Sequence, residues 1–222
     1  MTFLELVNKV LRGLREDTVE SLSGTYPRHI GQLVNQAKEE IEDMGPWEGL
    51  RDTVNGTAAI GVDTVDLTAD TNERSYLQYL NNVAQVFTYD AELEAVQLHL
   101  IQPNEMANLW LFNDSQPDSQ PVYASYTKTN GGLIFRLFPA PSETLTLRTR
   151  LIVPQAELTA TETELLIPSG PVWRRALVMA MEERGEDFAG PIERVRRDAD
   201  NYLMSAVMSD FLAQNTLTFE GQ

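Results

Sequence analysis

The chain has 222 residues, of which 42% are hydrophobic, and 33 acidic against 17 basic residues give it a net charge of −16. The hydrophobic content is enough for a folded core and excludes disorder of the whole chain. The acidic excess argues against an outer surface that binds nucleic acid. The lack of cysteine excludes disulfides and thiolate metal sites and fits a reducing cytoplasm. No apolar run approaches the roughly 20 residues of a membrane span, so we expect no membrane contact.

The first 49 residues are predicted to form a pair of helices. Thr2 and Glu5 have the spacing of a capping box directly before an amphipathic run, which predicts a helix over about 2–15. A second helix is predicted over about 26–44, because its apolar residues recur at steps of three and four after Pro27. The polar linker between the two helices is short enough to make them antiparallel.

From Leu50 the pattern changes to short segments with a two-residue period, which predicts a β-rich domain over 50–168. Turn residues separate these segments, and Asn55-Gly56 and Asn130-Gly131 are strong hairpin signals. A short helix is predicted to interrupt the strands from near Pro103. The predicted strands lie around 51–54, 58–60, 64–67, 84–89, 96–101 and 121–127.

The stretch 131–153 is predicted to be a β-hairpin at the centre of this domain. Its two halves alternate apolar residues with others, and residues 139–143 between them contain two prolines that suit a turn. One face of the hairpin is therefore expected to lie in the core. The opposite face carries Arg136, Arg148 and Arg150, which are expected to point outward.

Two more helices are predicted after the β domain. The first begins at 169–171 and ends near Gly185, and the second begins at Gly190-Pro191. Both carry an apolar stripe at helical spacing, which predicts that they pack against the N-terminal helix pair. The stripe of the second helix consists of Ile192, Val195, Ala199, Tyr202, Leu203, Ala206, Val207 and Phe211.

These segments together predict an α+β fold. Residues 1–49 and 169–213 are expected to form one helical bundle from the N- and C-terminal helix pairs, and residues 50–168 an inserted antiparallel β domain that is a sandwich or barrel-like. Residues 214–222 lose the helical period and are expected to form an extended C-terminal tail.

The sequence holds no recognisable catalytic, cofactor-binding or metal-binding motif. Phosphate loops, nucleophile elbows, zinc-binding helix motifs and calcium loops are all missing. The histidines His29 and His99 stand apart, and neither has a second ligand nearby in sequence. Arg194, Arg196 and Arg197 form a basic cluster, but acidic residues interleave it, so we expect intrahelical or intersubunit ion pairs here. The motifs therefore favour an interaction protein over an enzyme.

Five segments occur in an order that is informative. They are the opening TFLELVNKVLRGL from Thr2, the second helix closing on Gly-Pro-Trp47, the strand VYASY from Val122, the hairpin 132–142 with its PAPS turn, and the closing helix PVWRRA from Pro171. Together these segments, which span nearly the whole chain, resemble the head-to-tail adaptor proteins of tailed bacteriophages, also called connector or head-completion proteins.

The resemblance implies a structural protein of the virion that assembles as a homo-oligomeric ring, commonly dodecameric. In this family the ring lies beneath the portal protein at the capsid vertex and receives tail proteins such as a nozzle or tail tube. The DNA passes through its channel without specific binding. Such a protein assembles in the host cytoplasm and acts at the head–tail interface of the virion. This sequence departs from the compact all-helical adaptors by its larger β centre.

Under this resemblance, Leu217 and Phe219 are candidate docking residues for the portal or for the next subunit. They alternate with polar residues, a pattern that suits a strand added to a partner's sheet. The alternative is a phage tail or baseplate protein whose β domain binds carbohydrate or a fibre protein. Surface aromatic residues clustered on one β face would favour that alternative, whereas a closed ring with a central channel would favour the adaptor.

Overall fold

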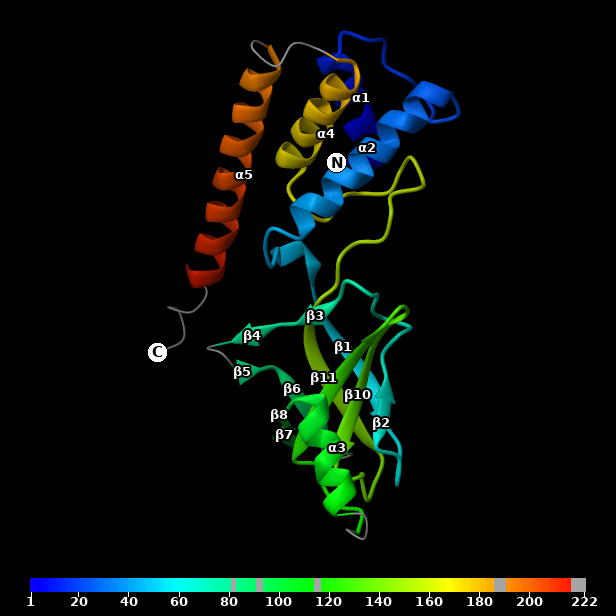
Figure 1. Ribbon diagram of the computed structural model, residues 1–222, viewed down its shortest axis with the longest axis vertical. Helices are drawn as coiled ribbons and strands as arrows, with labels where there is room; N and C mark the ends of the chain where they lie inside the picture. Colours follow the sequence, from blue (N-terminus) through cyan, green and yellow to red (C-terminus); the bar gives the residue numbers. More distant parts are fainter. Residues whose placement is uncertain (81–82, 91–93, 114–116, 186–190, 217–222) are drawn as a thin grey trace. The chain divides into compact units, whose positions relative to one another are not determined.

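The computed structural model describes residues 1–80, 83–90, 94–113, 117–185 and 191–216 (Figure 1). It is an α+β fold, as the sequence predicts. Its contacts divide it into two compact units, a helical unit of Met1–Leu50 with Gln155–Gln222 and a β unit of Arg51–Pro154. The helices are α1 (Phe3–Gly13), α2 (Thr25–Glu42), α3 (Pro103–Phe112), α4 (Ser169–Glu183) and α5 (Pro191–Thr216), with a 3-10 turn at Glu48–Leu50.

Helices α1 and α2 begin and end close to their predicted bounds. The capping box of α1 is present: the Glu5 amide donates to Thr2 Oγ1 at 3.3 Å, and the Thr2 amide donates to Glu5 Oε2 at 3.0 Å. Trp47, just after α2, is 2% exposed and donates its indole N–H to the Ile41 carbonyl at 2.7 Å. The N-terminal pair of helices is therefore confirmed.

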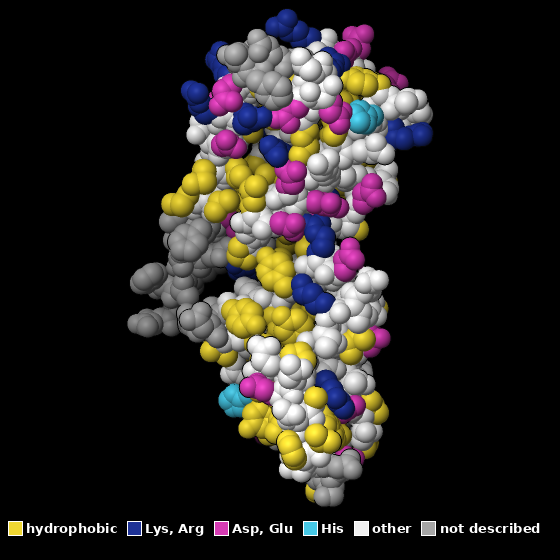
Figure 2. Space-filling view, in the orientation of Figure 1, with side chains coloured by type: hydrophobic (Ala, Val, Ile, Leu, Met, Phe, Trp, Pro, Cys, Tyr) yellow, Lys and Arg dark blue, Asp and Glu magenta, His cyan; other side chains and the backbone are white. Residues whose placement is uncertain are grey.

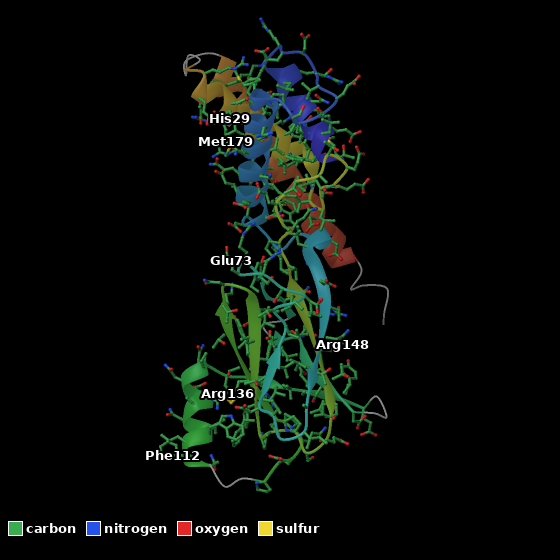
Figure 3. All side chains as sticks on the ribbon, turned by 90° about the vertical axis from the view of Figure 1, so that its right-hand side faces the viewer. His29, Glu73, Phe112, Arg136, Arg148 and Met179 are labelled. Carbon is green, nitrogen blue, oxygen red and sulfur yellow. The ribbon has the colours of Figure 1, made fainter. Side chains whose placement is uncertain are left out.

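Helix α4 is the central element of the helical unit, because it contacts α1, α2 and α5. Neighbours on several sides explain why it buries more than one stripe of residues. At its rim, Arg175 Nε donates to Glu40 at 2.7 Å and His29 lies 2.5 Å from Glu183, so two polar contacts tie α4 to α2. Figure 3 shows His29 and Met179 in this region. The buried residues of α4 are Pro171, Val172, Ala176, Leu177, Val178, Met179, Ala180 and Met181.

Residues 155–168, which the sequence assigns to the β domain, are grouped with the helices in the structure. Polar side chains of α2 bind the backbone of this irregular segment. Asn35 accepts from the Leu158 amide at 2.9 Å and donates to the Leu158 carbonyl at 3.0 Å. Lys38, which is fully buried, donates to Glu42 at 3.2 Å and to the Gln155 carbonyl at 2.5 Å. These bonds satisfy backbone groups that have no strand partner.

The β unit contains two main sheets. One has the order β1-β11-β6-β7 with β3 also paired to β11, and the other has the order β2-β10-β9-β8. All pairs are antiparallel except β8 with β9. The strands are β1 (Arg51–Ala58), β2 (Thr64–Asp66), β3 (Tyr76–Leu77), β4 (Tyr79–Leu80), β5 (Val83–Ala84), β6 (Val86–Tyr89), β7 (Ala95–Gln97), β8 (His99–Leu100), β9 (Tyr123–Thr129), β10 (Gly132–Phe138) and β11 (Leu145–Ile152).

One apolar core joins the two sheets, with buried residues from both, such as Phe135 on β10 and Leu147 on β11. Each sheet has its own edge strands and the two are not hydrogen-bonded into a closed cylinder, so the barrel-like alternative is wrong. Helix α3 begins at Pro103, as predicted, and buries Met106 completely. Its Trp110 meets Phe138 edge-on, with ring centroids 5.0 Å apart.

The predicted hairpin 131–153 is wrong in its pairing, although both of its strands exist. Strand β10 pairs with β9 and β2, whereas β11 pairs with β1, β6 and β3, so the two strands lie in different sheets. The chain crosses from one sheet to the other at 139–144. This crossing lets the apolar faces of β10 and β11 pack in the same core. Arg136, Arg148 and Arg150 are exposed, as expected.

The two predicted hairpin turns have different outcomes. Asn130-Gly131 does connect β9 to β10, where Thr129 pairs with Gly132. Asn55-Gly56 instead lies within β1, opposite Arg148 and Leu147. A Cβ atom at Gly56 would lie 2.5 Å from side-chain atoms of both Val65 and Leu67. Glycine is needed here because β2 approaches β1 closely. In the sequence, the same Asn-Gly pair looks like a hairpin turn.

Candidate subunit-contact surface

Helix α5 consists of two halves with different composition. Its first half is rich in charge, with Glu193, Arg194, Arg196, Arg197, Asp198 and Asp200. The second half carries apolar residues on most sides of the helix, with Ser205, Ser209 and the single charged residue Asp210 between them. A helix with so wide an apolar surface is normally covered on more than one side. The apolar residues of this second half are Tyr202, Leu203, Met204, Ala206, Val207, Met208, Phe211, Leu212 and Ala213.

The helical unit covers only one side of this apolar half. Ile192 and Ala199 are buried, whereas Leu203, Ala206 and Val207 are only half-buried. Met204 is 67% exposed and Met208 is 55% exposed. Figure 2 shows hydrophobic side chains over the middle of α5, below the charged side chains of its first half.

One contact holds the start of the apolar half against α4. The Arg174 guanidinium lies 3.3 Å from the ring centroid of Tyr202 and 4.2 Å from that of Trp173. Arg174 also donates to the Gly170 carbonyl at 3.1 Å. This stacking occupies one side of the Tyr202 ring, although the residue is 48% exposed, so its prediction as a buried stripe residue is wrong. At 3.6 residues per turn, Met204 projects from nearly the opposite side of the helix.

The three arginines of the predicted cluster have different surroundings. Arg196 contacts Glu182 of α4, and its second nitrogen lies 3.7 Å from Glu193 of its own helix. Arg194 and Arg197 are exposed. The structure therefore places Arg196 in ion pairs within the helical unit and leaves its two neighbours at the surface. The predicted docking residues Leu217 and Phe219 lie outside the described residues.

Sequence reasoning missed Met204 and Met208. The sequence analysis predicted one apolar stripe on α5, and these two methionines lie outside that stripe. The signal that identifies them is the loss of charge after Asp200 combined with apolar residues on most sides of the helix. Methionine is flexible and polarizable, and it is common on surfaces that adapt to a partner. An exposed patch of this kind marks an interaction site.

None of the helices described is long and apolar enough to cross a membrane. Within the described residues, no group of three or more potential metal ligands comes together. The candidate functional surface of the helical unit is the apolar half of α5, because its exposed apolar side chains suit association with another protein.

Comparison with known proteins identifies the family. A family model described as SU10 adaptor protein matches residues 1–214, which include all the described strands and helices α1 to α4. No curated protein matches the chain. The resemblance to phage head-to-tail adaptors is therefore confirmed, and the match supports a structural adaptor role in a phage virion. The chain belongs to the SU10 adaptor protein family.

Proposed function

We propose that this protein forms a homo-oligomeric ring, dodecameric as the resemblance implies, beneath the portal and links the capsid vertex to the tail. The observation that carries the proposal is the second half of α5, which has apolar residues on most of its sides and leaves Met204 and Met208 more than half exposed. Burying Met204 and Met208 against a neighbouring copy would remove apolar surface from water, at a gain of roughly 25 cal/mol per Å².

A ring needs two different surfaces on each copy, because only a head-to-tail contact closes with more than two members. The outer face of α5 is the first surface. For the second surface we propose the exposed apolar residues Met44 and Leu166, which also belong to the helical unit and are each 52% exposed. Met204, Met208, Met44 and Leu166 are all apolar, and a single chain leaves each of them more than half exposed.

The experiment changes each surface separately. Variant one carries Met204→Glu and Met208→Glu, and variant two carries Met44→Asp and Leu166→Asp. Sedimentation analysis should show a ring for the unchanged protein and monomers for each variant alone. A control with Gln32→Glu and Gln36→Glu, two exposed positions of α2, adds equal charge and should still form the ring.

Mixing the two variants tests whether the contact is head-to-tail. Each variant keeps one intact surface, so one productive contact forms and the mixture should give heterodimers. A dimer that joins the same patch on both copies would not be restored by mixing, because one copy would always carry the changed patch. Rings formed by variant one alone would contradict the role of α5.

We also propose that the DNA in the channel is not bound specifically, and that the protein has no catalytic role. The net charge of −16 supports the first point, since DNA affinity depends on neutralising phosphates. Fluorescence anisotropy with duplex DNA at physiological salt should show no binding by the free protein. Salt-dependent binding under these conditions would contradict the proposal.

We further propose that the two units are separate domains: a helical domain and an inserted β domain with boundaries near those of the compact units.

The alternative to the adaptor is a tail or baseplate protein whose β domain binds carbohydrate or a fibre protein, and it requires aromatic residues gathered on one β face. In the described part of the β unit, the large aromatic side chains exposed by more than a third are Tyr79 and Phe112, which line different hollows. Phe112 projects from the end of α3 (Figure 3). This separation favours the adaptor.

A further inference from the structure

The four-stranded sheet of the β unit has an edge that is only partly covered. Its last strand, β8, pairs with β9 at Tyr123 and Ala124 alone. Among the described residues, no strand pairs with the remainder of β9 on the side away from β10. The residues Ser125–Thr129 therefore form a free edge that begins where β8 ends.

Backbone groups along this free edge point outward at every second residue. On the β8 side, the Ala124 carbonyl accepts a hydrogen bond from the Ile101 amide at 2.9 Å. Because backbone groups alternate in direction along a strand, Tyr126 and Lys128 present their N–H and C=O groups on this same side, and Thr127 faces β10. The edge thus offers ladder positions at 126 and 128.

A hollow of about 1110 Å³ lies along the same edge. It is lined by Tyr126 and Lys128 of β9, by Tyr79 and Val83 of the β4–β5 ribbon, and by residues 98–103 around β8. Burial, followed by the nearby Tyr79 hydroxyl, raises the pKa of Tyr126. The two tyrosines thus share one partly sheltered space beside the free edge.

The hollow opens onto the apolar core of the β unit. The Tyr126 ring lies 5.9 Å from the ring of Phe135, centroid to centroid, and Phe135 is fully buried. Leu100 of β8 packs against the same core. A strand added beside β9 would therefore place every second side chain on the core face, next to Leu100 and Tyr126, and the others on the outer face.

The residues that follow α5 have the pattern such a strand requires. Leu217 and Phe219 are apolar and alternate with Thr218 and Glu220, so one side of an extended segment is apolar and the other polar. Helix α5 ends at Thr216, and its second half is the surface that we assign to neighbouring copies. In the proposed ring, Thr216 at the end of α5 lies at the boundary between two copies.

We propose that residues 217–220 of one copy bind as an added strand on the free edge of β9 in a neighbouring copy. Leu217 and Phe219 lie on the core face, and Thr218 and Glu220 lie on the outer face beside Thr127. Main-chain hydrogen bonds to positions 126 and 128 give affinity, and the two apolar side chains set the register. The inference rests on the proposed ring and adds a second, separate contact between its members.

Disulfide cross-linking of the full chain tests this contact, because the natural sequence has no cysteine. The test variants combine Thr127→Cys on the outer face with either Thr218→Cys or Glu220→Cys, which covers both outer positions of the segment. Facing strand positions lie within the Cα separation that a disulfide spans. Oxidation should give covalent dimers and larger ladders on a non-reducing gel. The control pairs Thr218→Cys with Thr146→Cys, an exposed residue of the other sheet, and should remain monomeric.

A second pair of variants tests the main-chain bonds. Adding Lys128→Pro to the cross-linking variants removes an outward amide of the free edge and leaves the β9–β10 hydrogen bonds intact, so the cross-link should be lost. Adding Lys128→Ala removes the charge but keeps the amide, so the cross-link should persist. Equal yields with proline and alanine would overturn the added strand.

The outcomes separate this inference from the proposed ring. Rings that sediment normally under reducing conditions but give no cross-link at either position would overturn the inference and leave the ring standing. An intrachain disulfide alone would also overturn it, since the occupant would be the same copy. Interchain cross-links without any ring would support the strand contact and remove the proposed ring.

Discussion

The helical unit and the β unit satisfy their buried polar groups in different ways. In the β unit, the buried polar residues described are Ser75, Thr88, Ser125 and Thr149, none of them charged. The helical unit buries Asn35, Lys38 and Glu42 on one side of α2. Strands satisfy one another's backbone groups, so a sheet core needs no charged side chain. The irregular segment 155–168 forms one bridge, between Glu164 and Thr2, and α2 supplies side chains to its backbone groups at Gln155 and Leu158.

The largest expected effect comes from breaking the charged pair on α2. Lys38→Met removes the buried ammonium that pairs with Glu42 and donates to the Gln155 carbonyl, and we expect it to lower the free energy of unfolding by about 3–5 kcal/mol. Chemical denaturation monitored by hydrogen-exchange mass spectrometry would assign the loss to the helical unit. Combining Lys38→Met with Glu42→Gln removes the charge but keeps an acceptor for the Gln155 amide, so the loss should be smaller. Equal losses for the single and double variants would show that charge is not the cause.

A cavity in the β unit tests the other side of the comparison. Leu147 is fully buried at the centre of β11, between β1 and β6. Leu147→Ala should cost about 2–5 kcal/mol through lost burial and an unfilled cavity. Thr146→Ala, at the exposed neighbouring position, is the control and should have little effect. If the two units are separate domains, hydrogen exchange should rise in the β unit alone, and a matching rise in α1 and α2 would contradict that proposal.

The next effect tests why glycine lies inside β1. Gly56→Ala places a methyl group 2.5 Å from atoms of Val65 and Leu67, so overpacking should cost about 1–3 kcal/mol. Thermal unfolding by circular dichroism measures the change. Gly45→Ala is the matched control, because nothing lies within 4 Å of its new methyl group. Adding Val65→Ala should recover part of the loss at Gly56, and no recovery would argue against crowding by β2.

The smallest effect is expected at the first helix. Thr2→Ala removes the oxygen that accepts the Glu5 amide, and should cost about 1 kcal/mol. Thr2→Ser keeps a hydroxyl at the cap and should retain most of the stability, as measured by the same thermal unfolding. A full loss in the serine variant would mean that the methyl group of Thr2, and not its hydrogen bond, is important.

Local patterns in the sequence predicted the helices and most of the strands. The capping box at Thr2, the apolar stripe of α2 and the proline at the start of α3 act within a few residues, so they can be recognised without knowing the fold. The order of these elements also carried the resemblance to phage adaptors. The candidate surface on α5 was only partly predicted. The apolar stripe indicated which residues of α5 pack against the other helices, but not that Met204 stays exposed.

Tertiary structure alone decided how the strands pair and which polar groups are buried. Alternation in β10 and β11 specifies which face is apolar but not which sheet each strand joins, and the shared core placed them in two sheets. Gly56 resembles a turn residue until the crowding by Val65 is known. Lys38 and Glu42 have the spacing of an ordinary exposed ion pair, yet both are buried, and both bind Gln155, which is distant in sequence. In each case, residues distant in sequence determine the pairing or the burial. A local sequence pattern therefore cannot predict either.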